Sequence, residues 1–247
     1  MVLPNIDIIN GLTGLEIILS GYILAILLFF KARKASNNTI KRRIILRGVG
    51  IFSVYQAWFG VSASFLLIIL GLPPLGYPDG NPNVGVLGYA WGPALGIPIW
   101  TYVALDTYKE SNYKRTVKLG FTFFMAILSL IFAILIYANP AEYTFWEASP
   151  GGLPETGIEG IALTLLSVML VIMMVFLGPT IIYSGFKIDN RNDKWRRFSL
   201  GIGITMASLF GIVDAAVSNL PLIGLAIVKA FIFTSIFLIY QGGEKGT

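Results

Sequence analysis

Seven long apolar runs dominate the sequence and restrict the chain to folds that cross a lipid bilayer. A helix needs about 20 apolar residues to span the hydrocarbon core, where lipid offers no partner for unpaired backbone groups. The runs lie at about 14–31, 44–70, 86–106, 117–138, 158–186, 197–218 and 221–241. They predict an all-α fold, with residues 1–247 forming a single transmembrane domain of seven helices.

The composition fits a chain that lies mostly in lipid, and it excludes several kinds of site. Charged residues make up 13% of the chain, against about 25% in a typical soluble domain. The sequence contains no cysteine and no histidine. Thiolate metal sites, most haem ligands and the base of a Ser–His–Asp triad are therefore excluded. We expect no metal site, no resident cofactor and no enzymatic activity.

All but one of the 18 lysines and arginines lie on the same side of the predicted membrane. They occupy the segments after the first, third and fifth runs and the C-terminal tail, whereas the opposite side carries only acidic charges. Because basic loops stay in the cytoplasm, we expect an outer N-terminus and a cytoplasmic C-terminus, in a multi-pass protein of the plasma membrane. Membrane lipids, and not nucleic acid, are the expected partners of these basic residues.

Short motifs recur in the same order in the two halves of the chain. The pairs are Thr13-Gly14-Leu15-Glu16 with Thr156-Gly157-Ile158-Glu159, Gly48-Val49-Gly50-Ile51 with Gly201-Ile202-Gly203-Ile204, and Pro93-Ala94-Leu95-Gly96 with Pro221-Leu222-Ile223-Gly224. Together they predict two parallel three-helix repeats, at about 11–108 and 156–242, joined by a linker helix at about 116–139. We expect each Thr-x-x-Glu motif to be a capping box at a helix start. A paired ion site of Glu16 and Glu159 is the alternative.

Lys229 is the one basic residue that lies far from both ends of an apolar run. At 1.5 Å per residue it lies about 12 Å beyond Pro221, and Asp214 lies about 8 Å from the same membrane surface. A charge at this depth is unfavourable unless it is paired, so we expect an ion pair between Lys229 and Asp214. The pair is either a structural clasp or part of a ligand site. Gln56 and Tyr102 are further candidate ligand-binding residues, unless they only form hydrogen bonds between helices.

Three short motifs carry a resemblance to a class of membrane proteins. They are Arg196-Arg197-Phe198, Leu220-Pro221-Leu222-Ile223 and Tyr240-Gln241-Gly242. With them, the chain resembles the seven-helix membrane domains of archaeal and bacterial sensor proteins. This resemblance implies a sensor or signalling module whose partner protein docks on the basic loops. A non-catalytic subunit of a larger membrane complex, or a homo-oligomer, is the related alternative.

Two further resemblances concern topology. The arrangement of three helices, a linker helix and three more helices is similar to that of SWEET-type sugar transporters, which implies a small-solute site between the two repeats. Seven helices with Lys229 in the last one resemble a microbial rhodopsin, which implies retinal bound to Lys229 as an opsin-like alternative. However, Leu225 stands where that family carries an aspartate, and no acidic residue lies between 86 and 105.

Overall fold

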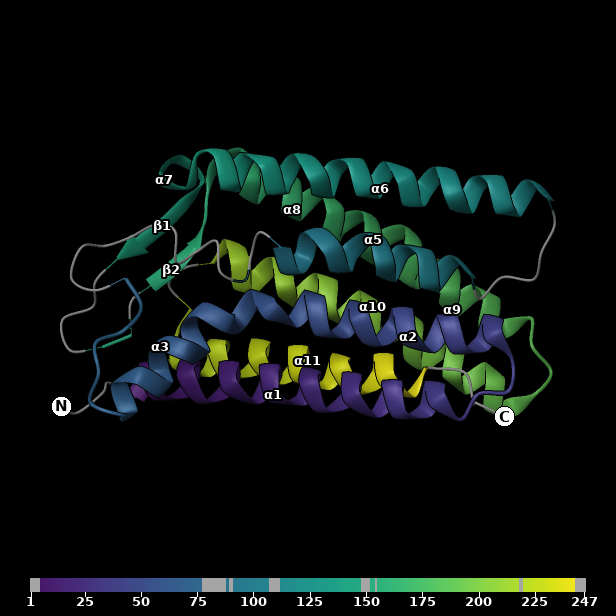
Figure 1. Ribbon diagram of the computed structural model, residues 1–247, viewed down its shortest axis with the longest axis horizontal. Coiled ribbons are helices and arrows are strands. Elements are labelled where there is room, and N and C mark those ends of the chain that lie inside the picture. Colours follow the sequence, from purple (N-terminus) through teal and green to yellow (C-terminus); the bar gives the residue numbers. More distant parts are fainter. Residues whose placement is uncertain are drawn as a thin grey trace.

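The computed structural model describes residues 5–76, 88, 91–106, 112–147, 152–153, 155–217 and 220–242. In this part of the chain the protein is almost entirely helical, and its long helices lie side by side along one axis (Figure 1). Six segments are long and apolar enough to cross a membrane. The prediction of an all-helical membrane fold is therefore confirmed in this coarse form.

The six candidate spans agree with the apolar runs, except that the first, second and fifth of them begin earlier, in more polar sequence. Two spans contain a short non-α segment, the 3-10 turn η1 and the π-helical segment η2. The bounds are α1 Asn5–Arg33, α2 Asn38–Val54, η1 Tyr55–Trp58, α3 Phe59–Ile69, α6 Asn112–Ala138, α8 Gly160–Ile172, η2 Met173–Leu177, α9 Gly178–Phe186, α10 Arg191–Ala216 and α11 Leu222–Gln241.

The run at 86–106 contains α5 (Trp91–Asp106), which has Pro98 inside it. Its 16 residues extend about 24 Å, less than the hydrocarbon core of about 30 Å. Residues 86, 87, 89 and 90 of this run lie outside the described residues. In the described part, α5 packs between α2 and α6.

One of the two non-α segments has a clear local cause in the sequence. The π segment η2 directly precedes Gly178 and Pro179. Proline lacks a backbone N–H and its ring clashes with the carbonyl four residues earlier, so a wider turn relieves the clash. The 3-10 turn η1 contains no proline. Three of its residues, Tyr55, Gln56 and Trp58, are buried.

Glycines in α2 let its two neighbours approach closely. A side chain on Gly48 would meet the Phe29 ring of α1 at 2.9 Å. A side chain on Gly50 would meet the Trp100 ring of α5 at 2.4 Å. Small residues allow such close helix contacts, and α2 accordingly packs against both α1 and α5.

The glycine pair in α10 has the same arrangement. A side chain on Gly201 would meet Ile182 of α9 at 2.6 Å, and one on Gly203 would meet Ile239 of α11 at 2.8 Å. Consequently α10 packs against both α9 and α11. The first glycine of each pair faces the preceding helix and the second faces the following one.

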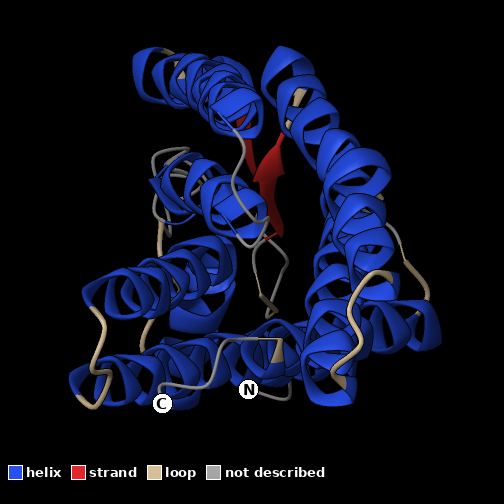
Figure 2. Ribbon diagram, turned by 90° about the vertical axis from the view of Figure 1, so that its right-hand side faces the viewer, coloured by secondary structure: helices blue, strands red, loops and turns tan. Residues whose placement is uncertain are grey.

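A small hairpin lies at the end of the bundle where α1 begins. The short helix α7 (Pro140–Tyr143) leads into β1 (Thr144–Glu147), which pairs antiparallel with β2 (Glu155–Ile158). In the view along the bundle from the opposite end, the strands lie beyond the helices (Figure 2). The sequence pattern does not predict these two strands.

The predicted capping boxes are wrong in both halves. Thr13 lies inside α1, which begins at Asn5, and its hydroxyl donates to the carbonyl of Ile9 at 2.7 Å. Thr156 belongs to β2, and Glu159 before α8 makes no capping hydrogen bond. In the first half, α1 already begins at Asn5, so Thr13 is not at a helix start. In the second half, the residues before α8 form the strand β2 and not a cap.

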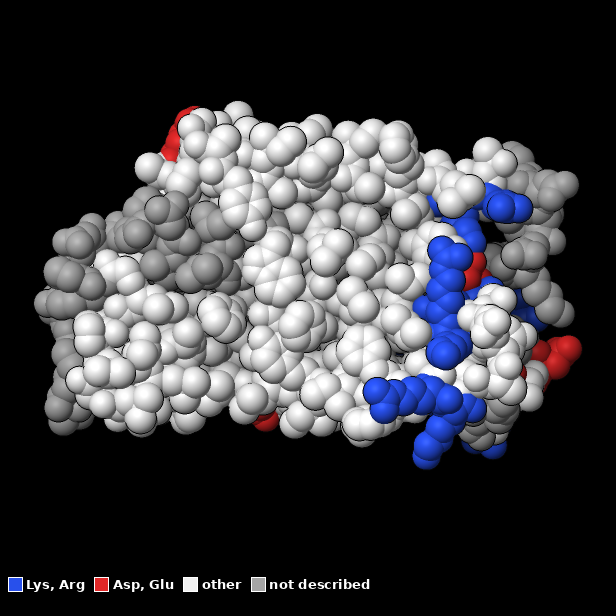
Figure 3. Space-filling model, viewed as in Figure 1, with Lys and Arg blue, Asp and Glu red and all other residues white. Residues whose placement is uncertain are grey.

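Charge is distributed unevenly along the bundle. Lysine and arginine side chains gather at the end where α11 terminates, and the middle of the visible face is almost free of charge (Figure 3). The outward face of α6 exposes many large apolar side chains, including Phe123, Leu130 and Ile134. This surface has the apolar band and charged end that a lipid environment requires.

Candidate functional site

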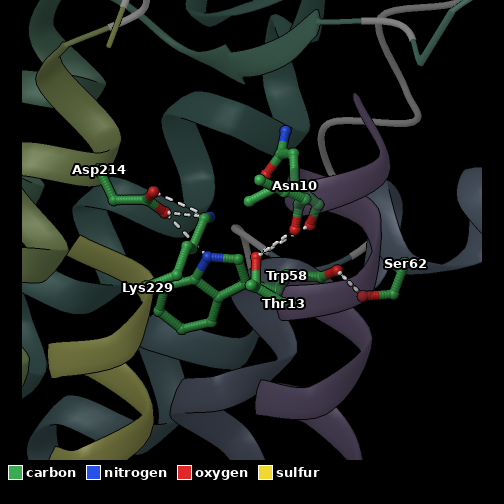
Figure 4. A network of polar contacts seen from close by, with 7 residues as sticks. Asn10, Thr13, Trp58, Ser62, Asp214 and Lys229 are labelled. Atoms are coloured by element: carbon green, nitrogen blue, oxygen red, sulfur yellow. Dashed lines mark hydrogen bonds and ion pairs between the residues drawn. The ribbon is translucent and has the colours of Figure 1, made fainter. Parts of the chain in front are cut away.

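Lys229 and Asp214 form the ion pair that the sequence predicts. The Nζ atom of Lys229 lies 2.8 Å from Oδ1 and 2.9 Å from Oδ2 of Asp214 (Figure 4). The side chain of Lys229 is 4% exposed and that of Asp214 is 13% exposed. Asp214 lies near the end of α10 and Lys229 lies within α11, so the pair joins these two helices.

Trp58 is a third member of the cluster. Its indole Nε1 donates a hydrogen bond to Oδ2 of Asp214 at 2.8 Å. The Lys229 ammonium also lies 5.4 Å from the centre of a Trp58 ring, within the range of a cation–π contact. The Asp214 carboxylate therefore holds together three elements, α10, α11 and η1.

The cluster lies on the wall of a cavity of about 290 Å³ at the hairpin end of the bundle. One part of the wall comes from α1, η1 and α3, and the other from β2 and from α8, α10, α11 and their connections. The charged residues among those that line it are Asp7, Glu159, Asp214 and Lys229, and Asn10 and Thr156 are polar. Among the lining residues, Glu159 and Ala216 are exposed, so the cavity reaches the surface.

Carboxylates outnumber ammonium groups in this wall. Among the described lining residues, three are acidic, Asp7, Glu159 and Asp214, and one is a cation, Lys229. Asp7 already accepts a hydrogen bond from the backbone N–H of Leu153 at 2.8 Å. Asp214 is occupied by Lys229 and Trp58, whereas the Glu159 side chain is exposed. The cavity is therefore acidic and retains carboxylate oxygens that a cation can approach.

The other two candidate residues lie apart from this cavity wall. Gln56 is buried in η1, where its Oε1 accepts a hydrogen bond from the hydroxyl of Tyr22 at 3.0 Å. Its Nε2 donates to the carbonyl of Phe52 at 3.2 Å. Tyr102 lines a second cavity, at the basic end of α5. Of the four predicted residues, the structure brings together only Lys229 and Asp214.

Sequence reasoning missed Trp58, Asp7 and Glu159 as members of one site. The acidic residues gave a signal, because both lie on the acidic outer side of the predicted membrane. Trp58 gave a weaker one, since it is two residues beyond Gln56 in the same run. Only the fold shows that these three residues line one cavity.

Comparison with protein-family models, curated proteins and solved structures finds no match for this chain.

Proposed function

We propose that this chain is a non-catalytic seven-helix membrane sensor whose ligand is a small organic cation bound in the cavity beside Asp214. In this proposal the protein lies in the plasma membrane, with its N-terminus outside the cell and its C-terminus in the cytoplasm. The ligand enters from the outer side, and a partner protein or a second copy receives the signal at the basic end.

One observation carries this proposal, namely the acidic cavity at the junction of three helices. Its three carboxylates attract cations, and Trp58 and Phe145 supply aromatic rings in the same wall. An ammonium ligand competes with Lys229 for the Asp214 carboxylate. Because that carboxylate links α10, α11 and η1, such competition changes a contact shared by three helices.

The proposed topology rests on the charge distribution. The basic residues gather at the end of the bundle where α11 terminates, and α1 begins at the opposite end (Figure 1, Figure 3). Because the first helix begins at one end of the bundle and the last helix terminates at the other end, the chain crosses the membrane an odd number of times. We take α5 as the span that brings the number of crossings to seven.

The glycine pairs support the proposed three-plus-one-plus-three repeat. In both triplets the middle helix contacts both flanking helices, with its first glycine against one and its second against the other. In the proposed repeat α2 therefore corresponds to α10, α5 to α11, and α6 is the linker helix.

A small-solute transporter is the second candidate, because residues of both proposed repeats line the acidic cavity. A site between two repeats is the arrangement expected when one half moves against the other. In that case the organic cation is carried across the membrane, whereas a sensor binds it without transport.

The test is a binding panel on purified protein in nanodiscs. Primary and quaternary ammonium compounds form the first set, and carboxylic acids of similar size form the opposite-charge set. We expect only ammonium compounds to raise the melting temperature. Glu159→Gln should weaken their binding about fivefold, since one exposed charge contributes about 1 kcal/mol. Asp193→Asn, which removes an exposed carboxylate at the basic end, is the matched control and should bind normally.

Other outcomes would redirect the proposal. Binding of carboxylic acids alone would contradict the charge argument, and binding of neither set would leave the ion pair as a structural clasp. Uptake of the bound cation into proteoliposomes would favour the transporter over the sensor. A visible absorbance band, with a borohydride-trapped adduct at Lys229, would favour the opsin-like alternative instead.

A further inference from the structure

A second cavity lies at the basic end of the bundle, among α2, α5 and α6. Its volume is about 460 Å³. The residues that line it in the described part of the chain are four cations and one carboxylate, together with Tyr102, Leu46 and two polar residues of α2. The charged residues are Arg42, Arg43, Asp106, Arg115 and Lys118. The excess of positive charge in this cavity favours the binding of an anion.

Among the described lining residues, one carboxylate faces four cations and leaves part of their positive charge uncompensated. Asp106 pairs with Arg43 at 2.5 Å and with Lys118. In the described part of the chain, neither Arg42 nor Arg115 forms an ion pair with a carboxylate. Two guanidinium groups are therefore available to an incoming anion, and guanidinium has the flat fork that matches phosphate oxygens.

Tyr102 helps to hold the cations at the cavity. The guanidinium of Arg42 lies 5.6 Å from the centre of the Tyr102 ring, and the Lys118 ammonium lies 4.7 Å from it. These cation–π contacts come from opposite neighbours, α2 and α6, with the ring between them on α5. The aromatic ring thus positions two of the cations without neutralising them.

We propose that this cavity binds the phosphate headgroup of an anionic membrane lipid. A soluble phosphate compound offers the same chemistry, but the surroundings favour a lipid. On α6, Leu119 and Phe123 follow Arg115 at steps of four residues and therefore share its face of the helix, and they are 48% and 67% exposed. Acyl chains can lie along this apolar face while the headgroup reaches the arginines. Basic pockets between helices at the membrane surface are suited to such headgroups.

The test measures lipid binding by native mass spectrometry of the full chain in mixed micelles. Phosphatidylglycerol and phosphatidylcholine with the same acyl chains are titrated separately. We expect wild-type protein to bind phosphatidylglycerol more tightly. Arg42→Ala with Arg115→Ala should lower that affinity about 25-fold, since each cation that lines the cavity and contacts the headgroup contributes about fivefold. Both side chains are exposed, so the variant should fold normally.

The matched control removes two cations at the same end but outside the cavity. Lys34→Ala with Arg191→Ala, both at exposed positions, should change phosphatidylglycerol affinity less than about twofold. An equal loss in both double variants would overturn the proposal, because general charge at this end would then explain binding. Equal affinity for the two lipids would overturn it as well. Displacement of phosphatidylglycerol by millimolar inorganic phosphate would assign the cavity to a soluble phosphate compound.

Discussion

Lys229→Met tests whether the Asp214–Lys229 pair stabilises the fold. Methionine keeps most of the length and the apolar stem of lysine but removes the ammonium group. Asp214 then keeps its hydrogen bond from Trp58 and loses its counter-charge. Breaking a buried ion pair from one side lowers stability by about 3–5 kcal/mol. Because Asp214 is 13% exposed and lines a cavity, we expect the lower value, about 3 kcal/mol.

Two double variants separate the charge from the hydrogen bond. Lys229→Met with Asp214→Asn removes both charges and retains an oxygen that accepts the Trp58 N–H. We expect it to lie within about 1 kcal/mol of the wild type. Lys229→Met with Asp214→Leu leaves the indole N–H without its acceptor, so it should be about 1–3 kcal/mol less stable than the asparagine variant.

The free energies of unfolding can be measured by SDS titration in mixed micelles, with tryptophan fluorescence as the signal. If Lys229→Met alone were within about 0.5 kcal/mol of the wild type, the pair would not be a structural clasp. Ligand binding by the double variants adds the functional readout. An asparagine variant that folds normally but no longer binds ammonium compounds would indicate a functional pair.

Two other substitutions have defined outcomes. Trp58→Phe keeps one aromatic ring but removes the indole N–H that binds Asp214, together with part of the buried side chain, so stability should fall by at least about 1.5 kcal/mol in the same titration; no change would mean that the bond contributes nothing. Gly203→Ala places a methyl group 2.8 Å from Ile239 and 2.9 Å from its backbone nitrogen, so it should destabilise by about 1–3 kcal/mol. Gly120→Ala is the control within α6, where nothing lies within 4 Å, and it should stabilise by up to about 1 kcal/mol; equal effects at both glycines would refute the packing argument.

The coarse architecture could be predicted because lipid imposes a simple rule on sequence. Runs of about 20 apolar residues have few alternatives to a membrane-spanning helix. The ion pair could be predicted for a similar reason, since Lys229 and Asp214 lie at related depths on consecutive helices that are joined by a short segment. In both cases a strong energetic penalty leaves one acceptable arrangement.

The finer features depend on contacts between segments that are distant in sequence. Trp58 meets Asp214 across 156 positions of the chain, and no local pattern indicates that contact. The 3-10 turn η1 also changes the direction of the side chains around Trp58, so counting residues along a regular helix misplaces them. Similarly, Thr156 has the same local motif as Thr13, yet one lies in a strand and the other inside a helix.

The helix formed by α2, η1 and α3 reaches both cavities, with Arg42 in one wall and Trp58 in the other. If this helix moves as one rod, the occupants of the two cavities are thermodynamically linked. A lipid that strengthens binding of the outer cation must then itself bind more tightly when the cation is present, by the same factor. The lipid composition of one leaflet would in this way set the sensitivity of the protein to a solute on the opposite side of the membrane.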